Sequence, residues 1–225
     1  TSGSTRALFS LPQSSASMGV LPTTEGWAED SAFTITPSVA GRLLTTTQIT
    51  STNGTYRYTN TTPQGTGVGV GAAFSARVAI SSYTAASNGD IGVIFGGNGY
   101  APFDINCYIT LRAAAGSTPA KVVLHEGVTT QAATFDWDDG LPHSYRCTLV
   151  ETDPTTCTIT FEADDTVLGT LVVFIPSNTV TQGAYFGHTG TNATVAVWHS
   201  FYWHSLPNES QASRTLGLWR GHLST

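Results

Sequence analysis

The chain has 225 residues, a formal net charge of −6 and only 11% charged residues. This length fits one sandwich or barrel domain, and an acidic balance argues against general nucleic-acid binding, which needs clustered cations to neutralise phosphates. Hydrophobic residues make up 40% of the chain, enough for a packed core, so global disorder is excluded.

Alternating apolar and polar residues predict short strands from about residue 33 to residue 203, separated by clusters of Gly, Asn, Asp and Pro. In chain order, the expected inward sets are Phe74, Ala76, Val78 and Ile80; Ile91, Val93 and Phe95; Ile105, Cys107, Ile109 and Leu111; Tyr145, Cys147 and Leu149; Cys157, Ile159 and Phe161; and Val195, Val197, His199, Phe201 and Trp203. A further strand is expected over 167–173, and turns at 88–90, 153–154 and 164–165.

Such apolar faces must be buried against one another, which predicts an all-β protein, a two-sheet antiparallel jelly-roll sandwich over residues 22–206. The flanking segments, an N-terminal arm (1–21) and a C-terminal arm (207–225), are rich in Ser and Thr and show no strand periodicity. Both carry large apolar residues, which disordered tails usually avoid. The two arms either fold back onto the sandwich or dock on a neighbouring subunit. Their large apolar residues are Leu8, Phe9, Leu11, Leu216, Leu218, Trp219 and Leu223.

The order of several motifs resembles laminin G-like and concanavalin A-like domains. Residues 137–146 (WDDGLPHSYR) are similar to the aspartate-glycine turn and the His that opens a core strand in that family. Residues 164–169 are similar to the following hairpin turn, and residues 186–190 and 197–202 to the closing glycine turn and last strand. The resemblance implies a jelly roll of two curved sheets whose concave face is often used for sugar binding. Pro142 departs from it, because a Trp commonly precedes the His.

Catalytic patterns on this fold are incomplete in the sequence. Glucanases need paired carboxylates on one strand face, but in the Glu162-Ala163-Asp164 segment the expected second Glu is replaced by Thr166 or Val167. A hairpin turn is the favoured interpretation of that segment. Polysaccharide lyases of related sandwiches typically use a Tyr-x-Lys strand, and the one lysine lies elsewhere, at Lys121. We therefore expect no enzyme activity, no catalytic residue and no cofactor.

Asp136, Asp138 and Asp139 form a local acidic cluster that could offer oxygen ligands to calcium. Their spacing does not match an EF-hand, and Asp-Asp-Gly also favours a tight turn. The turn is the favoured interpretation and calcium stays open. The six His are scattered without zinc-ligand spacing, so we expect no metal site.

Cys107, Cys147 and Cys157 are too few for a disulfide scaffold. Cys147 and Cys157 share the inward side of two adjacent predicted strands, so a cross-strand disulfide is conceivable, although parity alone does not place them opposite each other. Buried thiols are the favoured interpretation.

The outward residues of the predicted strands are the candidates for ligand binding. Arg77, Tyr108, Arg112 and Arg146 would line one solvent face if their strands are neighbours, and arginine and aromatic groups suit sugars. Alternatively, these arginines pair with Glu162 or Asp153 and only keep the sheet soluble. A second candidate is the glycine-rich loop that carries Asn98 and Tyr100, since recognition often uses loops.

These observations favour a non-enzymatic structural and adhesion module that binds cell-surface glycan and packs against sister subunits or other virion proteins through its arms. The lysine-poor composition resembles tail proteins of tailed bacteriophages. Residues 1–20 lack the pattern of a signal peptide, so we expect synthesis in the cytoplasm and a virion or extracellular location, with no nucleic-acid partner and no membrane insertion. The alternatives are a polysaccharide-active enzyme on the same fold and an assembly protein without sugar binding.

Overall fold

The computed structural model describes residues 13–30, 33, 35–48, 54–60, 71–84, 90–98, 107–114, 117–127, 129–153, 156–174, 183–190 and 193–206. The helical element in this part of the chain is the 3-10 turn η1 (Pro22–Glu25). The described residues contain no helix with the length and apolar character needed to span a membrane.

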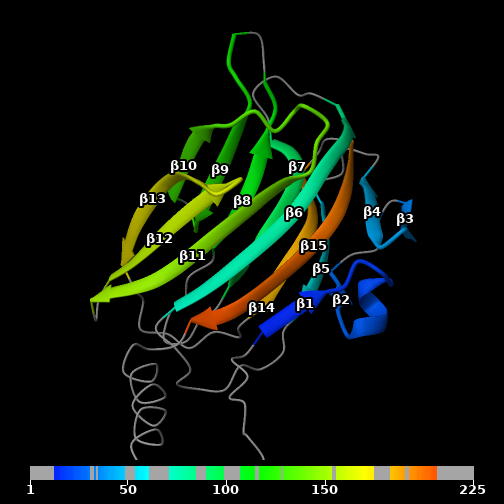
Figure 1. The fold of residues 1–225 in the computed structure, drawn as a ribbon, viewed down its shortest axis with the longest axis horizontal. Coiled ribbons are helices and arrows are strands. Elements are labelled where there is room, and N and C mark those ends of the chain that lie inside the picture. Colours follow the sequence, from blue (N-terminus) through cyan, green and yellow to red (C-terminus); the bar gives the residue numbers. More distant parts are fainter. Residues whose placement is uncertain are drawn as a thin grey trace, which may run out of the picture.

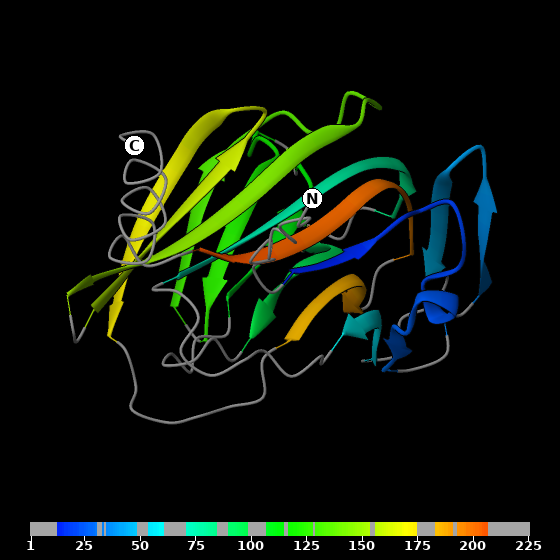
Figure 2. The ribbon, with the colours of Figure 1, turned by 60° about the horizontal axis from the view of Figure 1, so that its bottom comes forward.

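Two antiparallel sheets form the predicted sandwich (Figure 1). Sheet A runs in the order β13 (Thr166–Phe174), β12 (Thr156–Ala163), β11 (His143–Asp153), β6 (Gly71–Tyr83), β15 (Thr194–Leu206), β4 (Leu43–Gln48) and β3 (Ile35–Ala40), with β1 (Gln13–Ala16) paired to β15. Sheet B runs in the order β10 (Thr129–Thr134), β9 (Lys121–Glu126), β8 (Cys107–Arg112), β7 (Asp90–Asn98), β14 (Gly183–Gly190), β5 (Gly54–Asn60) and β2 (Ala28–Glu29). Figure 2 shows the β3–β4 hairpin at one end of the sandwich, beside η1.

The alternation in the sequence produces these strands because one face of each is buried. In β12, Cys157, Ile159 and Phe161 are buried, whereas the residues between them are half-buried. The predicted inward sets of β6 and β11 are likewise buried, and Asp164 and Asp165 form the predicted turn with positive φ of 45° and 61°. Tight β-hairpins favour such turns because their backbone matches the twist of the strands.

The prediction is wrong in two places. In β15, Ala196 and Trp198 are buried instead of Val195 and Val197, and His199 is only half-buried. The strand changes register between Trp198 and Ser200, and such an irregularity reverses the side-chain alternation. Residues 186–190, expected as a glycine turn, instead lie in the central strand β14.

The centre of the core is a cluster of aromatic rings from both sheets. Phe95 and Phe186 of sheet B meet Trp198 of sheet A, with ring centroids 6.1 and 5.0 Å apart, respectively. Phe201 stacks on Phe186 at 4.9 Å, and Tyr145 contacts Phe95 at 5.4 Å. Burying one such side chain contributes roughly 2–3 kcal/mol, so this cluster is the main force that holds the two layers together.

The described part of the predicted N-terminal arm folds back onto the sandwich, which was one of the two alternatives. β1 adds to sheet A beside the second half of β15, and Met18 is fully buried in the core. The apolar residues named above for residues 1–11 and 207–225 lie outside the described residues.

The three cysteines are buried, and none is in a disulfide. Cys147 lies opposite Phe161 of β12, and Cys157 lies opposite Glu151 of β11. Register therefore keeps these two sulfur atoms apart, and the conceivable Cys147–Cys157 bridge is not formed.

His188 ties the sheets together by a polar contact within the core. Its Nε2 lies 2.7 Å from Oγ1 of Thr46 on β4, and the same hydroxyl accepts a hydrogen bond from Nε1 of Trp198 at 2.9 Å. The other ring nitrogen, Nδ1, is buried without a hydrogen-bond partner. Burial lowers the pKa of His188 from 6.5 to about 4, because the charged ring would lose its hydration.

This lowered pKa predicts acid sensitivity. The unfolded chain takes up a proton at His188 near pH 6.5 and the folded chain only near pH 4, so the free energy of unfolding should fall over that window by about 3 kcal/mol. Denaturant titrations of wild type and His188→Gln across the window test this expectation. The two curves should converge as the pH falls, and parallel curves would contradict it.

A second prediction concerns Gly96 of β7, where β7 and β8 approach closely. A Cβ atom there would lie 2.4 Å from the Cys107 carbonyl oxygen and 2.6 Å from Cα of Tyr108. Gly96→Ala should therefore destabilise the protein by about 1–3 kcal/mol or more. The matched control is Gly19→Ala, whose Cβ would meet its nearest atoms at 3.9 Å and should change stability by less than about 0.5 kcal/mol. Equal effects of both substitutions on urea denaturation would refute this explanation.

Candidate functional site

The structure separates the predicted ligand-binding residues onto two faces. Arg77 of β6 and Arg146 of β11 project from the outer face of sheet A, whereas Tyr108 and Arg112 of β8 belong to sheet B. One shared face was expected only if these strands were neighbours, and that condition is not met because the strands lie in opposite layers. The side chain of Asn98, the last residue of β7, is not described. Tyr100 lies outside the described residues.

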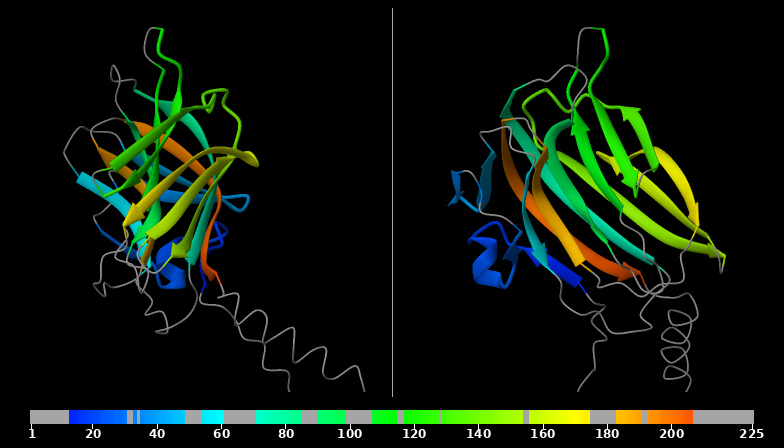
Figure 3. Two further views of the ribbon diagram at one scale, coloured as in Figure 1. Left: turned by 90° about the vertical axis from the view of Figure 1, so that its left-hand side faces the viewer. Right: turned by 180° about the vertical axis from the view of Figure 1, so that it is seen from behind.

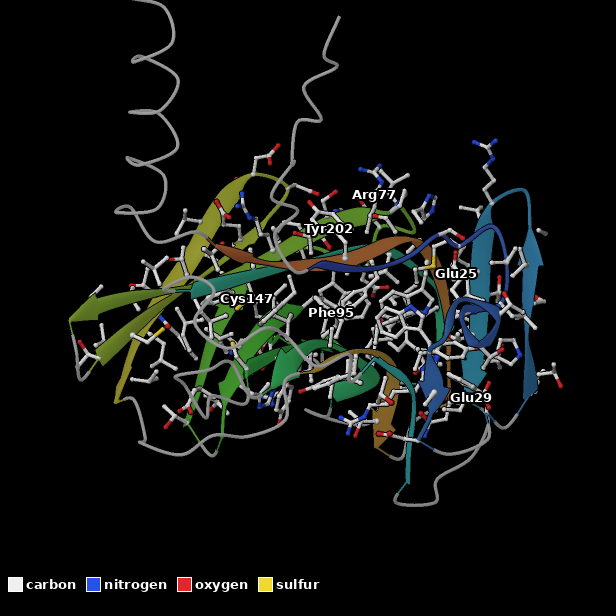
Figure 4. All side chains as sticks on the ribbon, turned by 90° about the horizontal axis from the view of Figure 1, so that it is seen from below. Glu25, Glu29, Arg77, Phe95, Cys147 and Tyr202 are labelled. Atoms are coloured by element: carbon white, nitrogen blue, oxygen red, sulfur yellow. The ribbon has the colours of Figure 1, made fainter. Side chains whose placement is uncertain are left out.

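The outer face of sheet A has a polar depression of about 300 Å³. Nη1 of Arg77 donates a hydrogen bond to Oγ of Ser144 at 3.2 Å, and Nε of Arg146 lies 4.0 Å from Oε2 of Glu162. Arg146 thus has the carboxylate partner that the alternative interpretation expected. In Figure 4, Arg77 and Tyr202 point away from sheet B, while Phe95 and Cys147 lie between the layers. This depression is a shallow surface of intrasheet polar contacts.

Aromatic and cationic side chains cross the outer face of sheet B. In the register of the sheet, Tyr185 of β14 lies opposite Gly96 of β7, Gly96 lies opposite Tyr108, and Tyr108 lies opposite His125 of β9. Figure 3 (right) shows the molecule from behind, with the strands of this sheet toward the viewer. We call Arg57, Tyr185, Tyr108 and His125 the ring row.

Contacts within the ring row hold its members together. The rings of Tyr108 and His125 are stacked, 4.4 Å apart with an interplanar angle of 8°, and Tyr185 lies 6.5 Å from Tyr108 above the space left by Gly96. The guanidinium carbon of Arg57 lies 4.3 Å from the ring centroid of Tyr185, a cation–π contact. Arg57 also forms an ion pair with Asp30. Four strands thus bring the half-buried Arg57, Tyr108 and His125 together around the buried Tyr185.

The chemistry of the ring row is suited to hydrogen bonding and ring contact. Burial raises the pKa of Tyr185 well above its usual value, so its phenol stays protonated. Oγ1 of Thr110 lies 2.8 Å from Nε2 of His125 and orients that ring. Tyrosine and arginine side chains combine flat surfaces with polar tips, which suits a ligand that has apolar C–H faces and many hydroxyl groups.

Positive charge continues along the same face. Lys121 lies opposite Arg112 at the other end of β8 and β9. Nε1 of Trp137 donates to the carbonyl oxygens of both residues at 3.2 Å, which fixes this end of the strand pair. Sheet B thus carries three cations, Arg57, Arg112 and Lys121, of which Arg57 is paired with Asp30.

Three ring-row residues were not predicted from the sequence: Arg57, His125 and Tyr185. The alternation of Lys121–Glu126 and Gly54–Asn60 could have placed His125 and Arg57 on an outward face. No signal in the sequence could have aligned them with Tyr108, because β14 lies between β5 and β7 and pairs with both.

The acidic cluster is divided among different partners. Asp138 accepts a hydrogen bond from the hydroxyl of Tyr83, which raises the pKa of Tyr83 to about 12. Asp139 accepts from the backbone N–H of Leu141 at 2.8 Å, as expected for the predicted turn. Within the described residues, no three His, Cys, Asp or Glu side chains converge as a metal site would require.

His143 lies between two carboxylates at the start of β11. Its Nδ1 is 2.6 Å from Asp164 Oδ2, and its Nε2 is 2.9 Å from Asp139 Oδ1. Burial opposes the charged ring, but the hydrogen bonds to Asp164 and Asp139 outweigh it and raise the pKa of His143 above 6.5. The contact joins the β12–β13 turn to the start of β11. Asp164 therefore has a structural partner, while Glu162 faces Arg146, so the two acids of this segment are engaged separately.

The raised pKa of His143 predicts a pH-dependent contribution to stability. The contribution is complete below pH 6.5 and is lost as the pH rises through the raised pKa. Asp164→Asn keeps a residue type that tolerates positive φ but removes the carboxylate beside His143. The substitution should lower the free energy of unfolding near pH 6. The expected loss is only about 0.5–1 kcal/mol, since solvent screens a partly exposed carboxylate. The loss should shrink toward about pH 9 in denaturant titrations.

Asp165→Asn is the control for that measurement. Asp165 occupies the same turn with positive φ and borders the polar depression of sheet A. A pH-dependent loss of the same size in Asp165→Asn would contradict the role given to His143.

No protein-family model and no curated protein matches the sequence. Solved structures share its fold. The carbohydrate recognition domain of Emp47p aligns with a TM-score of 0.52 and 13% identity over 80% of this chain and 88% of that chain. The alginate lyase Aly36B aligns with a TM-score of 0.54 and 8% identity over 89% and 94% of the two chains. A β-1,3-1,4-glucanase derived from a mouse hindgut metagenome aligns with a TM-score of 0.50 and 11% identity over 86% and 99%. The chain therefore shares its two-sheet fold with a carbohydrate recognition domain, an alginate lyase and a glucanase.

Proposed function

We propose that the protein binds polysaccharide on the outer face of sheet B, where the half-buried Arg57, Tyr108 and His125 form the contact surface and the buried Tyr185 supports them. The observation that carries the proposal is the alignment of Arg57, Tyr185, Tyr108 and His125 across neighbouring strands. The similar fold of a carbohydrate recognition domain, an alginate lyase and a glucanase supports a glycan as the ligand class.

The three cations of sheet B make an acidic glycan the favoured ligand over a neutral one. Arg57, Arg112 and Lys121 belong to strands of this sheet, and an arginine can hold a carboxylate or sulfate by two parallel hydrogen bonds. Contacts of this kind between exposed charges weaken as salt screens them. Binding of an acidic polysaccharide should therefore decrease with ionic strength.

A binding role, rather than hydrolysis, fits the groups of the ring row. Glycoside hydrolysis uses two carboxyl groups about 5–10 Å apart across the scissile bond. The carboxylate in contact with the ring row among the described residues, Asp30, is occupied by the ion pair with Arg57. The rival function is a polysaccharide-active enzyme, since a lyase and a glucanase have a similar fold. Product analysis would identify such an enzyme.

We extend the proposal to an adhesion component of a virion, of the tailed-bacteriophage kind, that packs against sister subunits or other virion proteins. Its support is the lysine-poor composition and the apolar residues of the two predicted arms. Glycan bound by the sandwich would then attach the assembly to a cell surface.

Tyr108→Ala tests the proposed site. It removes the central ring of the row, and the dissociation constant for a bound polysaccharide should rise about tenfold or more, since truncation of a central aromatic residue typically costs over 1 kcal/mol. The matched control is Tyr202→Ala on the outer face of sheet A, where Tyr202 is exposed; it should leave binding unchanged. Glycan arrays that include acidic and neutral polysaccharides would select the ligand, and isothermal titration calorimetry would measure both variants.

Other outcomes of this experiment distinguish the alternatives. Loss of binding in Tyr202→Ala but not in Tyr108→Ala would move the site to the depression of sheet A. Absence of binding to every glycan would favour an assembly protein without sugar binding. Release of reducing or unsaturated ends would identify an enzyme.

A further inference from the structure

Two buried thiols face each other across the sandwich. Cys107 lies on β8 of sheet B and Cys147 on β11 of sheet A, and their sulfur atoms are 3.2 Å apart. Both residues have no exposed surface. The sulfur atoms are thus already in contact between the two layers.

We propose that Cys107 and Cys147 are a disulfide-forming pair that links sheet A to sheet B covalently under oxidising conditions. The sulfur atoms need to approach by roughly 1.2 Å to reach the S–S distance of about 2.0 Å. Gly97, the partner of Cys107 in the register of β7, has no side chain that would block this movement. Neighbouring Ala184 of β14, which pairs with Gly97, is also small.

The oxidant for this step is a small-molecule disulfide such as oxidised glutathione. One cysteine thiolate attacks the glutathione disulfide, and a mixed disulfide forms while one glutathione thiolate leaves. The second cysteine thiolate then attacks the protein sulfur of the mixed disulfide, the Cys107–Cys147 bond forms, and the second glutathione thiolate leaves. In sum, two protein thiols become one disulfide, and one glutathione disulfide becomes two glutathione thiols.

Burial controls when this exchange takes place. Burial raises the pKa of the Cys107 thiol, and the adjacent Cys147 raises it further, so the thiolate is rare in the native state. Exchange in the folded protein is therefore slow, and the bond forms most readily during folding, while the sulfur atoms are accessible.

The link would constrain a long segment. The two cysteines are 40 positions apart, and a cross-link over a loop of this length lowers the conformational entropy of the unfolded chain. The oxidised protein should unfold at a temperature roughly 5–15 °C higher than the reduced protein.

The experiment refolds the full chain in a glutathione redox buffer or with dithiothreitol. Peptide mapping by mass spectrometry without reduction should recover a Cys107–Cys147 linked peptide from the first sample and Cys157 as an alkylated thiol. Differential scanning calorimetry should show the higher unfolding temperature in the glutathione sample only. Recovery of all three cysteines as alkylated thiols, or of a linkage that includes Cys157, would overturn the proposal.

Variants separate the link from a general effect of the buffer. Cys157→Ser keeps the pair and should retain the full difference between oxidised and reduced samples. Cys147→Ala removes one partner and should abolish that difference. Should Cys147→Ala fail to fold, the linked peptide of the wild type and of Cys157→Ser decides the proposal alone. This inference does not depend on the proposed glycan site, because linkage is measured without any ligand.

Discussion

The burial of the two apolar sheet faces against each other is the constraint on which the other features depend. Phe95, Phe186 and Trp198 meet in the middle of the sandwich, and the removal of apolar side chains from water is the dominant favourable contribution to folding. Because each strand turns its apolar face inward, most polar side chains of the alternating pattern lie on one of two outer faces. These faces are back to back, so residues of the two sheets do not form one flat surface.

Close backbone approach at Gly96 is what makes the outer face of sheet B continuous. A side chain at this position would collide with β8. Because Gly96 has no side chain, the rings of Tyr108 and Tyr185 approach each other across β7, with centroids 6.5 Å apart. The same sheet carries Arg57, Arg112 and Lys121 in a protein whose net charge is negative. In the proposed function these side chains would provide the charged contacts to an acidic ligand.

Specific contacts supplement the apolar packing between and within the layers. The His188–Thr46 contact and the Cys107–Cys147 pair both join sheet A to sheet B, whereas His143 holds the turn at the edge of sheet A. The two histidines respond to pH in opposite directions because burial dominates at His188 and carboxylate hydrogen bonds dominate at His143. Each histidine thus has a structural role that its residue type alone does not reveal.

Side-chain alternation and turn chemistry are local, so the amino-acid sequence was enough to predict the fold class, the inward residues of strands such as β6, β11 and β12, and the turn at Asp164. It failed in β15, where an irregularity reverses the alternation after Trp198, and at residues 186–190, whose glycines belong to a central strand. It identified Tyr108 and Arg112 as outward residues but not their neighbours Arg57, His125 and Tyr185. Which outward residues share a face and which cysteines meet became known from the folded arrangement, since both depend on the order of non-consecutive strands and on the stacking of the two sheets.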